Sequence, residues 1–154
     1  MKNKFLALLP TLILAASTGF VAPSFAQNTA APAMVNDQLY QTFGAKPGLV
    51  KLIDDFMVRL LADPRTGPHF KPVDQKHVKE QLVDQFCVLT GGPCEYKGAD
   101  MKSTHTNLDI TKSDFNALVE VLQLSMDAQG IAFSQQNKLL AKLAPMHRDV
   151  ITVE

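Results

Sequence analysis

The stretch GGPCEYKGADMKSTHTNLDI, residues 91–110, breaks an otherwise helical pattern and carries one histidine, His105. Two glycines and a proline at its start end the helix that precedes it, and a further glycine lies in its middle. Met101 precedes His105 by four residues, and Ile110 follows it. Helices of a small bundle are ordinarily joined by short turns, so a long irregular segment here asks for a functional explanation. Such an explanation requires that the flanking helices form a binding pocket with His105 on its wall.

The composition of the chain limits the choice of protein class. The 154 residues indicate one domain, and 46% apolar with 19% charged residues is typical of a globular protein. The formal net charge is zero, and the sequence has no run of lysines or arginines. This pattern argues against binding to nucleic acid.

Residues 1–26 have the pattern of a secretory signal peptide. Lys2 and Lys4 are followed by an uncharged, mostly apolar run over 5–21, and Ser24-Phe25-Ala26 places small residues before a cleavage site after Ala26. A membrane anchor is the alternative, but the run is short for a membrane span. We therefore expect export, to the periplasm of a bacterium, with no membrane attachment after cleavage. Residues 27–36 read as a flexible linker, and 37–154 as the folded domain.

Two cysteines, Cys87 and Cys94, would then lie in an oxidising compartment. They flank the Gly-Gly-Pro break, and a helix end that turns back could bring them together as a disulfide. The alternative is two separate thiols, with Cys87 buried. The sequence has no further cysteine and no CxxCH motif, which argues against a zinc site and against c-type haem attachment.

Apolar residues recur with helical spacing, which predicts an all-α fold with four main helices. We expect a short helix over 37–43, long helices over 47–61, 74–90, 111–130 and 134–150, the last interrupted near Pro145, and a loop over 62–72. Asp74 and Ser134 are expected N-caps, and Thr111 with Asp114 forms a capping pattern. The apolar faces are Leu49, Leu52, Ile53, Phe56, Met57, Leu60 and Leu61; Val78, Leu82, Phe86 and Leu89; Phe115, Leu118, Val119, Leu122 and Met126; and Leu139, Leu140, Leu143 and Val150.

A b-type haem suits these residues. His105 can offer a neutral imidazole nitrogen to iron, while its other ring nitrogen donates to a backbone carbonyl and fixes the ring. The same apolar residues could equally form a plain core, because four such helices can close without a cofactor. Candidate walls are Met57, Phe70, Val78, Leu82, Phe86, Met101 and Ile110, and candidate cations for the propionates are Lys79, Lys97 and Lys102.

From Leu39 to Val150 the chain resembles the group I truncated haemoglobins, the 2-on-2 globins. Its central block resembles the family pattern GGPxxYxGxxMxxxH and ends on His105. Phe70 falls on the aromatic residue that packs on the haem. Further matching pieces are Leu39-Tyr40 with Phe43-Gly44, Asp55-Phe56, and Arg59-Leu60-Leu61-Ala62-Asp63, whereas Ala45 replaces a family glycine.

The resemblance implies one haem b (iron protoporphyrin IX) per chain, with His105 as the proximal ligand. Two helix pairs would enclose the haem, with the helix over 74–90 on the distal side. The expected ligands are O2, NO and CO. Some members of the family oxidise NO to nitrate, and a reductase of unknown identity would return Fe(III) to Fe(II).

The chain departs from its family on the distal side. Met57 stands where the family usually has a tyrosine that donates to bound O2, and a thioether cannot donate. Val78 and Leu82 stand where the family often has glutamine, so Gln81 is the residue that could reach in. Loss of a hydrogen bond to a partly charged Fe–O2 costs roughly 1.5–3 kcal/mol, or about ten- to a hundredfold in affinity. We therefore expect fast O2 dissociation, and a relative preference for CO and NO.

The same residues would also suit two functions other than gas binding. Met57 could ligate the iron and give a six-coordinate, electron-transfer or haem-handling protein, or the fold could be a helical interaction module that has lost haem. A distal His or Arg for peroxidase chemistry is not evident. We expect His77 to point outward and His69 to lie at the surface. His147 lies within about one residue of a position that is covalently bonded to haem in some family members, and a surface or core role is preferred for it here.

Overall fold

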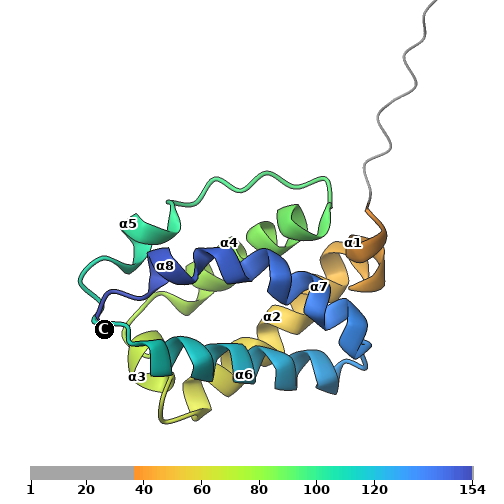
Figure 1. The fold of residues 1–154 in the computed structure, drawn as a ribbon. Helices are drawn as coiled ribbons and strands as arrows, with labels where there is room; N and C mark the ends of the chain where they lie inside the picture. Colours follow the sequence, from red (N-terminus) through yellow and green to blue (C-terminus); the bar gives the residue numbers. More distant parts are fainter. Residues whose placement is uncertain (1–36, 154) are drawn as a thin grey trace, which may run out of the picture. The chain divides into compact units, whose positions relative to one another are not determined.

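The computed structural model describes residues 37–153, and the expected signal peptide and linker lie outside these residues. The described residues form helices and connecting segments without a strand, which confirms the prediction of an all-α fold (Figure 1). The elements are α1 (Gln38–Thr42), α2 (Ala45–Ala62), α3 (Gly67–Phe70), α4 (Gln75–Thr90), α5 (Met101–His105), α6 (Lys112–Ala128), α7 (Phe133–Leu143), the 3₁₀ helix η1 (Ala144–Met146) and α8 (His147–Val150).

Helix α2 begins two residues earlier than expected. Gly44 adopts a left-handed conformation, with φ of +79°, and acts as its N-cap, so that Pro47 falls within the first turn. Proline is tolerated there because the amides of the first turn have no partner within the helix. The expected apolar face is buried from Leu49 to Leu60, whereas Leu61 is partly exposed.

The termini of the other helices follow local side-chain chemistry. The carboxylate of Asp74 accepts a hydrogen bond from the backbone N–H of His77 at 3.1 Å, as expected of an N-cap. Thr111 and Asp114 form a complete capping box at the start of α6. The expectation of Ser134 as an N-cap is wrong, because α7 begins at Phe133 and Ala132 is its N-cap. The expected loop over 62–72 contains one helical turn, α3.

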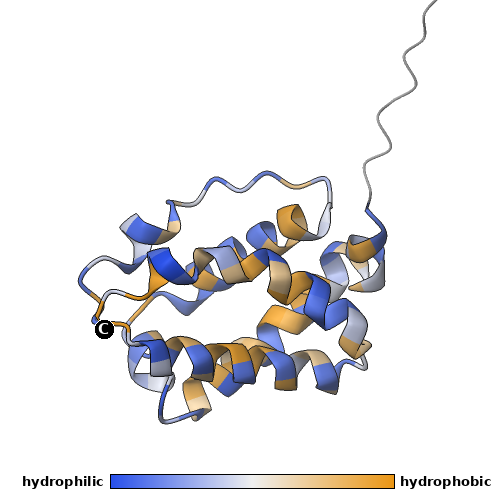
Figure 2. Cartoon of the chain, viewed as in Figure 1, coloured by the Kyte–Doolittle hydropathy of each residue, from blue (hydrophilic) through white to orange (hydrophobic). Residues whose placement is uncertain are grey.

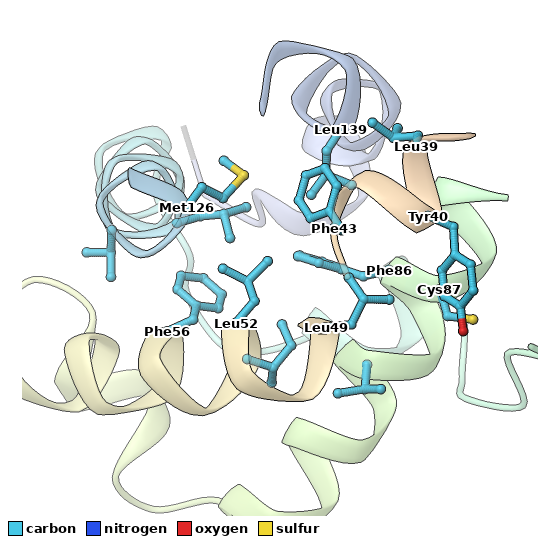
Figure 3. Packing of buried hydrophobic residues seen from close by; sticks show 14 of the residues in the cluster. Leu39, Tyr40, Phe43, Leu49, Leu52, Phe56, Phe86, Cys87, Met126 and Leu139 are labelled. Carbon is cyan, nitrogen blue, oxygen red and sulfur yellow. The ribbon is translucent and has the colours of Figure 1, made fainter. Parts of the chain in front are cut away.

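The helices pack as two pairs. Helix α2 packs on α4 and on α6, and α6 packs on α7, as in the 2-on-2 globin arrangement. Figure 3 shows side chains of α2, α4, α6 and α7 meeting in one core, and Figure 2 shows apolar residues recurring along these helices. A buried amide also joins the second pair, since Gln136 Nε2 donates to Asp127 Oδ1 at 2.6 Å and to the Ile131 carbonyl at 2.8 Å. None of the helices described is long and apolar enough to cross a membrane.

The end of α4 is tied to the segment that follows it. Cys87 and Cys94 form a disulfide with a Cα–Cα distance of 5.8 Å, which decides between the two alternatives for these residues. Gly92 allows the turn to pack closely, because a Cβ there would lie 2.6 Å from Cys87 Sγ and from the Tyr40 ring. Residues 93–100 then run as an extended segment from the end of α4 to α5 (Figure 1).

Candidate functional site

A cavity of about 530 Å³ lies between α4, α5 and α6. Its size is within the range of small-molecule and cofactor sites. Most of its walls are apolar, and each helix from α2 to α8, with the 3₁₀ helix η1, contributes at least one residue. The lining residues are Phe56, Phe70, His77, Val78, Gln81, Leu82, Gln85, Phe86, Tyr96, Lys97, Gly98, Ala99, Met101, Thr104, His105, Phe115, Leu118, Val119, Leu122, Leu143, Met146 and Val150.

A second cavity of about 180 Å³ adjoins the first. The two share Phe70, Val78, His105 and Phe115 among their walls. Ile110, one of the expected wall residues, lines this second cavity. The two spaces therefore belong to one site, and His105 lines both of them.

The size of the larger cavity indicates that it is built for an occupant. At about 24 cal/mol per Å³, an empty apolar cavity of this volume would cost on the order of 10 kcal/mol. Part of the space is open to solvent, so this figure is an upper bound. Filling the cavity with a large apolar group would remove this cost.

His105 is the last residue of α5, and its hydrogen bond fixes its tautomer. Nδ1 lies 2.7 Å from the backbone carbonyl oxygen of Met101, one turn earlier. A carbonyl can only accept, so Nδ1 carries the proton and Nε2 keeps a free lone pair. This is the arrangement of a metal-ligating histidine whose other nitrogen is held by a backbone acceptor. The aspartate N-cap of α5, in which Asp100 Oδ1 accepts from Ser103 N at 2.9 Å, holds this short helix in place.

These residues fit haem better than a bare metal ion. Among residues 37–153, no three side chains of His, Cys, Asp or Glu gather to hold an ion. The cavity instead offers one imidazole and wide apolar walls from α4 and α6, which suit an iron that brings its own macrocycle. Phe70, Val78, Leu82, Phe86 and Met101, all expected as walls, line this space.

One edge of the cavity is polar. His77 and Gln81 lie one turn apart on α4, and Tyr96 and Lys97 come from the segment after it. The Tyr96 hydroxyl donates to the Ala99 carbonyl at 2.9 Å, and burial together with the nearby Asp100 carboxylate raises the pKa of Tyr96. Lys97 is the cation that could meet carboxylates of an occupant at this edge, and the imidazole of His77 could donate a hydrogen bond to them.

Two of the expected propionate partners lie elsewhere. Lys79 points to α2, where its Nζ lies 2.7 Å from Asp54 Oδ1, and it does not line the cavity. Lys102 is exposed on α5 and does not line it either. The side of a helix on which a long cation lies depends on the partner that the neighbouring helix presents, and the sequence of one helix does not show that partner.

Met57 also lies outside the site. Its side chain is buried, with 3% exposed, but it lines neither cavity, whereas its neighbour Phe56 lines the larger one. Met57 is thus not among the walls of either cavity, and its role as a distal group or sixth ligand stays a prediction.

The remaining histidines lie at the margins. His77 is exposed, as expected, yet it lines the rim of the larger cavity. His69 lines the second cavity, with Nε2 3.8 Å from Asp114 Oδ2. His147 lines neither cavity and packs edge-on against Phe115, with ring centroids 5.3 Å apart.

Sequence reasoning missed several polar and apolar wall residues. Gln85 is buried in the wall, and its Nε2 lies 3.4 Å from Met101 Sδ and 3.7 Å from Met146 Sδ. Its position one turn after Gln81, beside the apolar stripe of α4, was the available signal. Phe115, Leu118 and Leu122 were expected only as the apolar face of α6, and that face turns out to be a wall of the site.

Fold and site together are those of an all-helical protein whose apolar cavity, with one histidine on its wall, suits haem. The chain matches the bacterial-like globin family over residues 38–152, and it belongs to that family. It is 29% identical over 116 residues to a group 1 truncated haemoglobin of Mycolicibacterium paratuberculosis, which covers 75% of this chain and 85% of the relative. A group 1 truncated haemoglobin of Tetrahymena pyriformis is 26% identical over 113 residues, covering 73% and 93%.

The fold is also similar to solved structures. The crystal structure of truncated haemoglobin from Tetrahymena pyriformis in the Fe(III) form matches with a TM-score of 0.71 at 25% identity, covering 75% of this chain and 98% of that one. The prediction of a truncated globin fold is thereby confirmed. As a member of this family, the chain is a haem protein with one haem per chain, and its iron binds gaseous ligands.

Proposed function

We propose that this chain is an exported group 1 truncated haemoglobin that binds O2, NO or CO reversibly at haem b, with His105 as the iron ligand. When bound, haem supplies the iron that coordinates the gas. The chain supplies a proximal imidazole, apolar walls and a polar edge. The similarity to group 1 truncated haemoglobins of Mycolicibacterium paratuberculosis and Tetrahymena pyriformis supports the assignment to this group.

The observation that carries the proposal is the hydrogen bond of His105. Because Nδ1 donates its proton to the Met101 carbonyl, Nε2 of the neutral ring is left with a lone pair that can coordinate iron. The ring lines both cavities, so a planar occupant of the larger cavity would meet it. His105 would hold iron, and Lys97 with His77 would meet the propionates.

The distal wall supports weak retention of O2. Val78, Leu82 and Phe86 present apolar side chains along α4, and Phe56 adds a ring from α2. Gln81 lines the cavity, but its side chain is packed against the segment after α4, since a Cβ on Gly98 would clash with Gln81 Oε1. A bound gas would therefore meet few donors, which weakens O2 more than CO or NO.

Export is part of the same proposal. The pattern of residues 1–26, which lie outside the described residues, motivates it, and the disulfide in the domain is of the kind found in oxidising compartments. A periplasmic location would require a reductant of its own to return Fe(III) to Fe(II). Cell fractionation of the full-length chain, with mass determination of the mature N-terminus, tests this point, and full-length protein in the cytoplasm would contradict it.

Optical titration of the purified domain with haem tests the function. We expect saturation at one haem per chain, a five-coordinate ferrous spectrum, and immediate binding of CO. A low-spin ferrous spectrum that resists CO would contradict a gas-binding role. An O2 dissociation rate as slow as that of tyrosine-containing relatives would contradict the apolar distal wall.

A further inference from the structure

We propose that the Cys87–Cys94 disulfide is a redox-controlled latch on the wall of the haem cavity. Its reduction by a dithiol would release residues 93–99 from α4 and speed the exchange of haem. The inference rests on the proposed function, because it concerns the same cavity.

The latched segment is a wall of the site. It contributes Tyr96, Lys97, Gly98 and Ala99 to the larger cavity, starting two residues after Cys94. At the other end of the bond, Cys87 is fully buried on α4 and directly follows Phe86, another wall residue. The disulfide therefore joins two walls of one cavity.

Few other interactions hold this segment. Within the described part of the chain, no backbone–backbone hydrogen bond involves residues 93–99; the bonds stop at Gly92 N and resume at the Asp100 carbonyl. The hydrogen bond from Tyr96 to Ala99 and the ion pair of Lys97 with Glu95, at 3.3 Å, lie inside the segment. Packing against α4 and the disulfide are what attach it to the domain.

The packing against α4 is itself incomplete. The Gln81 side chain lies against Gly98 and the Tyr96 hydroxyl, and its buried Oε1 has no hydrogen-bond partner among the described residues. A buried polar atom without a partner costs free energy, so this contact does not favour the closed segment strongly. The disulfide is accordingly a main attachment that holds residues 93–99 against α4.

The bond can be reached from one side. Cys94 is partly exposed, whereas Cys87 has 0% exposure, so a reductant would attack Cys94 Sγ. A dithiol thiolate forms a mixed disulfide with Cys94, and Cys87 leaves as a thiolate that takes up a proton. The second thiol of the reductant then displaces Cys94 and forms the oxidised reductant. Two electrons pass from the dithiol to the protein, which ends with two thiols.

Opening should affect haem exchange without altering the iron bond. His105 lies in α5, which is capped by Asp100 and packs on α8, so the disulfide does not hold it directly. We therefore expect the ferrous iron–histidine stretching band to be the same in both redox states. Only residues 93–99, which lie between the end of α4 and Asp100, gain freedom.

Haem transfer to an excess of haem-free myoglobin measures this directly. Reduction of the wild type should speed transfer about tenfold, because the ring that the disulfide closes no longer restrains the wall. Cys94→Ser should transfer haem at the reduced rate and ignore the reductant. Glu95→Gln, in the same segment, keeps the bond and should behave as the oxidised wild type. The proposal would be overturned if the haem-transfer rates of the oxidised wild type, the reduced wild type and Cys94→Ser agreed within about twofold, with two free thiols verified by titration in the reduced wild type.

A second readout needs no haem. In the haem-free protein, tryptic cleavage after exposed Lys97 should be about tenfold faster in Cys94→Ser than in the wild type, whereas cleavage at Arg59 in α2 should be unchanged. Equal acceleration at both sites would show general unfolding and overturn the latch. Absence of haem binding in both redox states would refute the proposed function, and the cleavage comparison would still decide on the latch.

Discussion

Leu82→Gln places a hydrogen-bond donor in the apolar distal wall and should slow O2 dissociation. Leu82 lines the cavity on α4, one turn after Val78 and one turn before Phe86, so a side chain there reaches the space opposite His105. A hydrogen bond to a partly charged acceptor contributes roughly 1.5–3 kcal/mol, which corresponds to about ten- to a hundredfold in dissociation rate. CO dissociation should change much less, because bound CO carries less charge.

Stopped-flow displacement of O2 by CO measures the rate. Leu82→Met is the matched control, because methionine has a similar volume but no donor, and its rate should stay within about threefold of the wild type. If Leu82→Gln and Leu82→Met released O2 at the same rate, the distal wall assigned to α4 would be wrong. A slower rate in both variants would indicate that side-chain bulk, and not a hydrogen bond, controls escape.

Three further predictions concern single side chains. Met57→Leu should leave the ferric and ferrous spectra unchanged, because Met57 lines neither cavity; a change in spin state would restore it as an iron ligand. Gln81→Leu should leave the free energy of unfolding of the haem-free domain unchanged or raise it by up to about 1 kcal/mol, because it removes a buried oxygen that has no partner among the described residues. A clear loss of stability in calorimetry would contradict this. Asp114→Asn should cost about 1 kcal/mol at neutral pH. Hydrogen bonds from Thr111 and the charge of His69 lower the Asp114 pKa below its ordinary value of 3.8. The stability that Asp114 contributes is therefore present above pH 3.8 and is lost as the pH falls through the folded-state pKa. If urea unfolding still showed a stability difference between the wild type and Asp114→Asn at pH 2, the ionised Asp114 cap would be refuted as its source.

Local chemistry explains how much of the fold the sequence could predict. The Asp74 cap and the Thr111–Asp114 box depend on residues three apart, and both were predicted correctly. The start of α2 was missed, because it depends on the left-handed conformation of Gly44. The start of α7 was missed because Ser134 is a better N-cap by residue type than Ala132, which holds that position in the structure. Such choices depend on the packing of the whole domain.

The site was predictable where a motif defines it and unpredictable where two helices meet. The block that ends on His105 led to the expectation that one ring nitrogen of His105 donates to a backbone carbonyl, and the structure has this bond to Met101. Whether Phe56 or Met57 faces the cavity depends on the rotation of α2 by one residue against its neighbours, which helical spacing does not fix. Lys79 was misplaced for a similar reason, because its partner Asp54 lies on another helix.

The most direct test of His105 as the iron ligand is resonance Raman spectroscopy of the ferrous haem complex of the wild type and of His105→Gly. The wild type should show an iron–histidine stretching band. The variant should lack this band, bind haem weakly, and regain a five-coordinate imidazole spectrum when imidazole is added to fill the space left by the side chain. An unchanged band and unchanged haem affinity in His105→Gly would contradict the account, because another residue would then hold the iron.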